Sequence, residues 1–225
     1  MGRMLDVFFS PTKVFTYLKE KPQWVVAFII VIVVVAVVGA VSVGITRETI
    51  IEQQTEAMRE RGLTEEQMDQ ALRVASGPLL YISSAVGAAI FTALLLVVFA
   101  FLLNVFTPVF GGTAAFKTVF SLISHTALVR TLGAIVKLIL VVITKSIYVT
   151  TSLALLVPNM ARESFGYQFL NGCDFFIIWE MILVAIGINI TNQVPKKSAY
   201  ILVFMIWLVS LFVGAFLATL RGPGA

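Results

Sequence analysis

Long apolar runs dominate this chain and define its predicted elements. Three of them contain no charged residue over at least 22 positions. A helix needs about 20 apolar residues to cross the hydrocarbon core of a bilayer, so each of these runs is long enough to span it. Two further apolar stretches carry only a few charged residues. The pattern predicts an all-α polytopic membrane protein, a bundle of five transmembrane helices at residues 24–45, 78–106, 117–144, 175–191 and 199–220.

The segment before the first run, residues 1–23, has the pattern of a short amphipathic helix. Ser10 followed by Pro11 indicates a helix start, because serine can cap a helix and proline at the first helical position loses no needed donor. Trp24 then marks the membrane interface. We expect this interfacial helix to lie on the membrane, the alternative being a solvated leader. Its apolar face is formed by Val14, Phe15 and Leu18.

Residues 46–77, between the first two runs, are polar and hold seven acidic residues and four arginines. Gly62 is a plausible helix stop, and Thr64 with Gln67 has the spacing of a capping box. The segment therefore predicts two helices around Gly62, a helical hairpin outside the membrane. A solvated connection with no further role is the alternative.

Composition agrees with a membrane protein and excludes other classes. Hydrophobic residues make up 59% of the 225 positions and charged residues 12%, whereas soluble domains are about 45–50% apolar and about 25% charged. A soluble domain of this length has no interior large enough to bury so much apolar surface. The net charge of +4 is typical of basic residues near anionic lipid, so no nucleic-acid partner is expected.

The residues that would support catalysis or metal binding are scarce. A single cysteine, Cys173, excludes an internal disulfide or a CxxC site, and a single histidine, His125, excludes HExxH zinc chemistry. His125 shares a stripe with Lys117, Ser121 and Ser124, which indicates an interfacial helix segment more than a reactive site. We therefore expect no catalytic set, no metal and no cofactor, and the chain is not expected to be an enzyme.

Three charged residues inside predicted spans form the candidate polar site: Arg130, Lys137 and Glu180. A charge at mid-bilayer costs roughly 2.5–3.5 kcal/mol on insertion scales, so these residues need partners or a role. One interpretation is a polar pathway or ligand site, and the other is an interhelical ion pair. Lys137 and Glu180 fall at the same estimated depth and are expected to pair, with Arg130 as the second-choice partner. The depth estimate depends on whether the third span begins near Lys117 or near Arg130.

Short motifs at both ends of the chain resemble a known family. The N-terminal motif is Phe8-Phe9-Ser10-Pro11 with Pro22-Gln23-Trp24. The C-terminal half contains Thr151 to Leu156 (TSLALL), then Asp174-Phe175-Phe176-Ile177-Ile178-Trp179, then Ala185-Ile186-Gly187. This progression resembles the bacterial Yip1-domain proteins over nearly the whole chain, and the motif residues Ser10, Pro11, Trp24, Asp174 and Trp179 are carried over with it.

The resemblance implies a non-enzymatic integral protein of a prokaryotic plasma membrane that acts through partners. Expected partners are the lipid bilayer and other membrane proteins or a second copy of the chain. Eukaryotic members of the family bind Rab-type GTPases, but their DLYGP-like motif is not found in this sequence. The rival class is a small transporter or channel subunit that uses Arg130, Lys137 and Glu180.

Basic residues near the span ends predict the orientation. They are equally numerous on the two sides, but they cluster before the first span and, as Lys196 and Lys197, between the fourth and fifth. Clustered basic residues in short segments favour the cytoplasmic side. We therefore expect a cytoplasmic N-terminus, with the C-terminus and residues 46–77 outside.

This orientation predicts how introduced cysteines react with a membrane-impermeant thiol reagent added outside intact cells. In a Cys173→Ser background, Gln67→Cys should be labelled and Gln193→Cys should be protected. Labelling of Gln193→Cys without labelling of Gln67→Cys would overturn the orientation.

Overall fold

The computed structural model describes residues 2–75, 77–113, 115–146 and 148–220, and this part of the chain is helical apart from loops and one isolated β-bridge. Two short 3-10 helices lie at Thr107–Phe110 and Leu153–Leu156. The α-helices are α1 (Gly2–Phe9), α2 (Pro11–Glu20), α3 (Val25–Glu60), α4 (Glu65–Ala75), α5 (Pro78–Phe106), α6 (Phe116–Thr144), α7 (Phe165–Gly172), α8 (Phe175–Thr191) and α9 (Lys196–Leu220).

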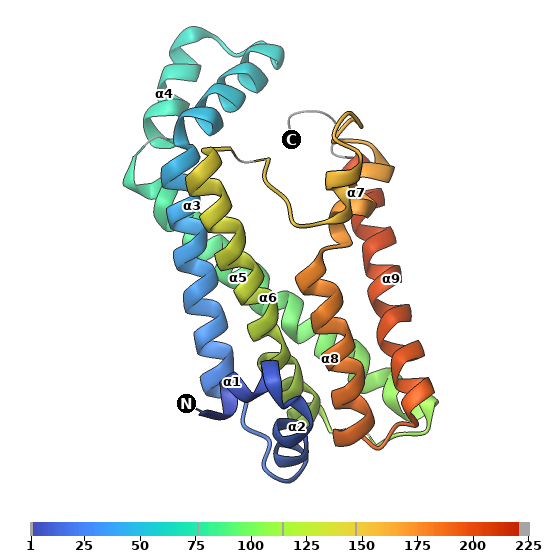
Figure 1. The fold of residues 1–225 in the computed structure, drawn as a ribbon. Coiled ribbons are helices and arrows are strands. Elements are labelled where there is room, and N and C mark those ends of the chain that lie inside the picture. The colour runs from blue at the N-terminus through green and yellow to red at the C-terminus, as the bar shows by residue number, and fades with distance from the viewer. Residues whose placement is uncertain (1, 76, 114, 147, 221–225) are drawn as a thin grey trace.

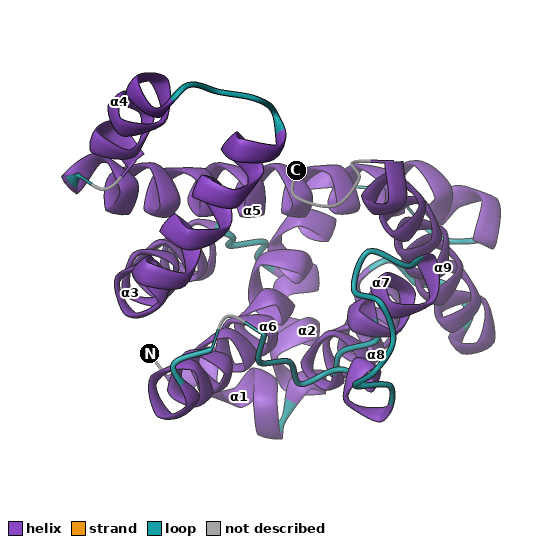
Figure 2. Cartoon of the chain, turned by 90° about the horizontal axis from the view of Figure 1, so that it is seen from above, coloured by secondary structure: helices purple, strands orange, loops and turns teal. Residues whose placement is uncertain are grey.

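Helix α6 lies at the centre of the bundle. It contacts α3 and α5 on one side and α8 on the other, and α8 in turn packs against α9. Seen from above, α6 lies between α3 and α8, with α9 beyond α8 (Figure 2). Helix α5 runs obliquely behind α3 and α6 (Figure 1). The remaining short helices lie at the two ends of the bundle, α1 and α2 at one end and α4 and α7 at the other (Figure 1).

The N-terminal half of α6 is surrounded on every side, since each residue from Thr118 to Val129 is buried. Its buried hydroxyl groups are satisfied within the helix. Ser121 donates to the Lys117 carbonyl at 2.6 Å and Ser124 donates to the Phe120 carbonyl at 2.7 Å. These bonds remove the cost of unpaired polar groups in an apolar core. Three residues of the stripe that we interpreted as interfacial, Ser121, Ser124 and His125, are therefore buried, whereas Lys117 at its start is exposed.

Four helices of the described chain are long and apolar enough to cross a membrane: α3, α5 with the 3-10 helix that follows it, α6 and α9. Their outward faces carry exposed apolar side chains, which suits contact with lipid. Helix α8 is apolar but has only 17 residues, about 26 Å at 1.5 Å per residue. That length is at the lower limit for a span of about 30 Å, so a fifth crossing remains a prediction.

The N-terminal leader packs on the bundle. Helix α2 starts at Pro11 as expected, although the Ser10 side chain makes no capping hydrogen bond. The expected apolar face is buried, but it contacts α8 and α6 instead of lipid. Each such side chain contributes about 1.5–3 kcal/mol when removed from water, which explains why the leader closes the end of the bundle. The buried residues are Val14, Phe15 and Leu18.

The acidic segment forms a helical arm, defined here as residues 46–75. Its first part continues α3 without a break up to Glu60, so the span and the arm share one 36-residue helix. At about 54 Å, this helix is longer than the hydrocarbon core is thick. From the sequence we expected a separate helix here. The continuity was not evident because a change from apolar to polar residues leaves the backbone hydrogen bonds unaffected.

The turn between α3 and α4 forms where we expected it. Gly62 has φ +74°, a left-handed conformation that glycine adopts without a steric penalty. The Thr64 amide donates to the Gln67 side chain at 3.0 Å, and the Gln67 amide donates to the Thr64 hydroxyl at 3.3 Å. This reciprocal pair is the expected capping box, and it starts α4 at Glu65.

Removal of the cap should loosen α4 selectively. Thr64→Ala should cost about 0.5–2 kcal/mol of local helix stability, because one amide at the helix start loses its acceptor. Hydrogen exchange of the amides in α4 should accelerate accordingly. Thr55→Ala is the matched control, since Thr55 lies inside α3 and alanine is the better helix former there. Equal exchange in Thr64→Ala and the parent protein would show that the cap contributes nothing.

Candidate functional site

Two of the three charged residues expected inside spans meet at the contact between α6 and α8. The Arg130 Nε donates to Glu180 Oε2 at 2.7 Å. The Glu180 side chain is fully buried, whereas the Arg130 side chain is 34% exposed. A buried carboxylate requires a nearby cation and hydrogen-bond donors, and Arg130 supplies both. Arg130 therefore supplies the counter-charge of the fully buried Glu180 side chain.

The α6–α8 contact has a defined antiparallel register. A Cβ atom built on Gly133 would lie 2.8 Å from the Phe176 Cβ, and one built on Gly187 would collide with Leu122. Gly133 lies three residues after Arg130 in α6, and Phe176 lies four residues before Glu180 in α8. The Gly133–Phe176 contact and the Arg130–Glu180 pair therefore fit the same antiparallel register. Because neither glycine has a side chain, Phe176 and Leu122 can contact the backbone of the opposite helix, and α6 and α8 can pack closely.

The expected pairing of Lys137 with Glu180 is wrong. Lys137 lies two helical turns beyond Arg130, level with the chain that precedes α8. Our depth estimate assumed that α6 and α8 reach the membrane surface together. In the structure α6 continues for about 14 Å beyond the start of α8. Glu180 therefore pairs with Arg130, which we had expected only as its second-choice partner.

Lys137 instead borders a small polar cavity of about 220 Å³ at the start of α8. Arg130 reaches the same cavity from α6. The polar residues on its other side come from the loop after α6, from α7 and from the first residue before α8: Thr150, Thr151, Asn171 and Asp174. Neither the two threonines nor Asn171 was expected at this site from the sequence, and the polar start of the TSLALL motif was an available signal for Thr151 alone.

Asp174 is the N-cap of α8. One carboxylate oxygen accepts from the Phe176 amide at 2.8 Å and from the Ile177 amide at 3.4 Å. The other accepts a short hydrogen bond from the Thr151 hydroxyl. A carboxylate at a helix N-terminus is also favoured by the helix dipole, so Asp174 both starts α8 and ties it to the preceding loop. Burial raises the pKa of the adjacent Cys173 thiol, which makes it a poor nucleophile.

The aromatic motif residues also make structural contacts. The Phe8 and Trp179 rings pack edge to face with centroids 5.9 Å apart, so the N-terminal motif meets the motif of α8. Trp24 packs against Phe28 and Phe120 at centroid distances of 5.7 and 5.2 Å. Aromatic pairs in these geometries add about 0.5–1.5 kcal/mol beyond the area they bury. Motifs from opposite ends of the chain therefore join the leader to the bundle.

The arrangement can hold helices in register, and one polar atom in it is unpaired. Within the described chain, Glu180 Oε1 is buried without a hydrogen-bond partner. The described residues contain no group of three or more side chains that could hold a metal ion. The residues of the α6–α8 contact bond mainly to one another and to the backbone, which is the pattern of a structural joint.

The Arg130–Glu180 pair predicts a stability signature in detergent. Arg130→Met and Glu180→Leu should each lower the free energy of unfolding by about 1–3 kcal/mol, because each leaves a charged partner unpaired. The double variant should recover much of the loss, since it leaves no charge behind. Thermal or denaturant unfolding of the four proteins gives this double-mutant cycle.

Lys137→Met is the matched control, because it removes an exposed cation of the same helix, seven residues or about two helical turns beyond Arg130. It should change stability by less than about 0.5 kcal/mol. Simple additivity of the Arg130 and Glu180 losses, or coupling between Lys137 and Glu180, would contradict the pairing.

Comparison with known proteins agrees with these motifs. The Yip1 domain model matches residues 5–218. The chain is similar to membrane protein YknW of Bacillus subtilis (strain 168), with 28% identity over 219 residues that cover 94% of this chain and 89% of the relative. No solved structure matches the chain significantly. Since the domain model covers nearly the whole sequence, this chain belongs to the Yip1 family of membrane proteins.

Proposed function

We propose that this chain is a non-enzymatic membrane protein that works by binding other membrane proteins, and that its arm makes the contact. The observation that carries the proposal is the division of its polar residues. Buried polar groups of the bundle pair largely with one another or with backbone, as Arg130 does with Glu180. The exposed acidic side chains of the described residues lie mainly on the arm, which carries seven of the nine.

The arm presents an acidic face of regular spacing. Four glutamates recur at every fourth position of the outer part of α3, so they follow one side of the helix, and all four are exposed. They are Glu48, Glu52, Glu56 and Glu60. Helix α4 adds exposed carboxylates at Glu65, Glu66 and Asp69. Such a face suits a partner surface that is rich in lysine or arginine.

The arm is held at a fixed angle, which favours binding. It continues a membrane helix without a joint, and Gln53 donates to the Tyr148 hydroxyl at 2.6 Å. The guanidinium of Arg162 lies 3.6 Å from the centre of the Tyr148 ring. A pre-organised surface loses less conformational entropy on binding than a flexible one. The loop between α6 and α7 therefore supports the base of the arm.

A second candidate function is transport, because a polar cavity adjoins Lys137 and Arg130 at the α6–α8 contact. An intramembrane charge is a functional candidate by default. In proteoliposomes, saturable flux of a solute that is lost in Glu180→Gln would favour this class. Equal flux in the parent and in Glu180→Gln would count against it.

The arm proposal predicts where crosslinks form in native membranes. A photo-reactive amino acid at Glu56 or Gln70 should give a protein adduct of discrete mass, whereas the same probe at Ile90, on the exposed apolar face of α5, should give none. An adduct of twice 24.6 kDa would identify a second copy of the chain as the partner. Other masses would identify a different protein.

Charge removal provides the control for specificity. The triple variant Glu48→Gln, Glu52→Gln and Glu60→Gln should reduce the Glu56 adduct at least fivefold, because interface charges steer association. Glu163→Gln, an exposed acid outside the arm, should leave it unchanged. Adducts of equal yield at Glu56 and Ile90 would refute the proposal.

A further inference from the structure

Residues of α1, α3 and α6 line a crevice beneath α1. Helix α1 lies at the end of the bundle opposite to the arm (Figure 1). The crevice has two parts, a polar pocket of about 380 Å³ and an apolar groove of about 600 Å³. Met4 lines both parts, so they adjoin each other. The first part is called the polar pocket because Gln23, Lys117 and His125 line it among apolar residues, whereas the groove is lined almost entirely by apolar side chains.

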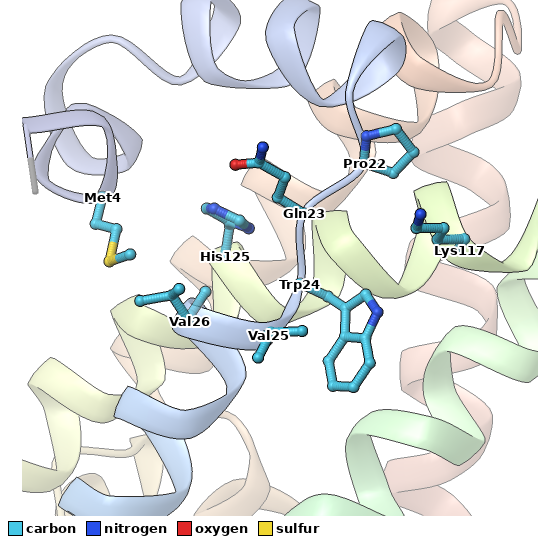
Figure 3. Close-up of a pocket in the computed structure, with 9 residues that line it drawn as sticks. Met4, Pro22, Gln23, Trp24, Val25, Val26, Lys117 and His125 are labelled. Atoms are coloured by element: carbon cyan, nitrogen blue, oxygen red, sulfur yellow. The ribbon is translucent and has the colours of Figure 1, made fainter.

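The polar pocket presents cationic and neutral polar groups. Lys117 and His125 of α6 line it together with Gln23, and Figure 3 shows their side chains around the segment from Pro22 to Val25. None of the residues that line the pocket is acidic. Trp24 also lines it, and tryptophan is typical of the level of lipid headgroups. The charge and position of the pocket fit an anionic group at the membrane surface.

His125 is oriented for a second polar contact. Its Nδ1 lies 2.8 Å from the Ser121 carbonyl oxygen, and a carbonyl only accepts, so Nδ1 carries the proton of this hydrogen bond. The neutral ring then leaves Nε2 as an acceptor. The side chain is only 7% exposed, and its remaining access is to the pocket. A headgroup with a hydroxyl donor would satisfy this nitrogen.

The apolar groove continues from the pocket along α3 and α6. Ile30 and Val34 line it from α3, and Leu132 and Ile135 line it from α6. Ten residues of α3 separate Trp24 from Val34, about 15 Å along the helix axis. This is half the thickness of a hydrocarbon core of about 30 Å, the depth that one acyl chain reaches. Phe8 and Trp179 complete the wall, so the leader helix forms part of the groove.

We propose that this crevice binds an anionic glycerophospholipid from the leaflet on the N-terminal side. The phosphate lies against Lys117, a headgroup hydroxyl donates to His125 Nε2, and one acyl chain lies in the groove beneath α1. An apolar protein helix in the groove would leave Lys117 without an anionic partner and His125 Nε2 without a donor, so the polar groups of the pocket favour a lipid. This proposal goes beyond the arm and does not depend on it.

Binding to purified, delipidated protein in detergent tests the headgroup contact. Phosphatidylglycerol should bind more tightly than phosphatidylcholine in native mass spectrometry, and Lys117→Gln should weaken phosphatidylglycerol binding about fivefold, the effect of one basic residue near an anionic surface. Lys117→Arg should restore it. Lys197→Gln, which removes an equal charge at the start of α9 outside the pocket, should leave it unchanged. Equal losses in Lys117→Gln and Lys197→Gln would show only non-specific attraction and would overturn the proposal.

The groove is tested separately from the pocket. Ile135→Trp should fill the groove and lower the binding of both phospholipids at least fivefold, whereas Ile139→Trp, one turn further along α6 and outside the groove, should not. A soluble headgroup, glycerol 3-phosphate, should compete only weakly because it lacks the acyl chain. Full competition by glycerol 3-phosphate, or unaltered phospholipid binding in Ile135→Trp, would refute a lipid site.

Discussion

A carboxylate that is fully buried among apolar helices must have a cation beside it, and this requirement organises the contact on which the bundle depends. Arg130 supplies that cation to Glu180, and the pair favours the observed register of α8 on α6. Gly133 and Gly187 face side chains of the opposite helix and allow the close approach that the pair requires. Helix α6 then contacts both halves of the chain, because α3 and α5 pack on its other side.

The family motifs are contacts within this framework. Asp174 starts α8 and accepts from Thr151, which joins the TSLALL segment to the helix that carries Glu180. The packing of Phe8 on Trp179 seats the leader on the same helix. Motifs that are short and apolar in the sequence thus lie at joints between helices far apart in the chain.

Local features were predictable from the sequence, whereas long-range pairing was not. The capping box of Thr64 and Gln67 depends on residues three apart, so its pattern suffices. The apolar face of α2 was identified correctly, but the pattern is the same whether the face meets lipid or protein. The partner of Glu180 depends on how far α6 extends beyond α8, which no local pattern records. The polar pocket beneath α1 was missed for the same reason, since Gln23 and Lys117 meet only in the fold.

Disulfide formation between introduced cysteines tests the register of α6 on α8 most directly. In a Cys173→Ser background, Gly133→Cys combined with Phe176→Cys should crosslink on mild oxidation in membranes, because these positions face each other. Gly133→Cys combined with Val184→Cys should not, since Val184 lies two turns away along α8. Efficient crosslinking of the second pair and none of the first would mean that α8 is displaced by two turns, and it would contradict the pairing of Arg130 with Glu180.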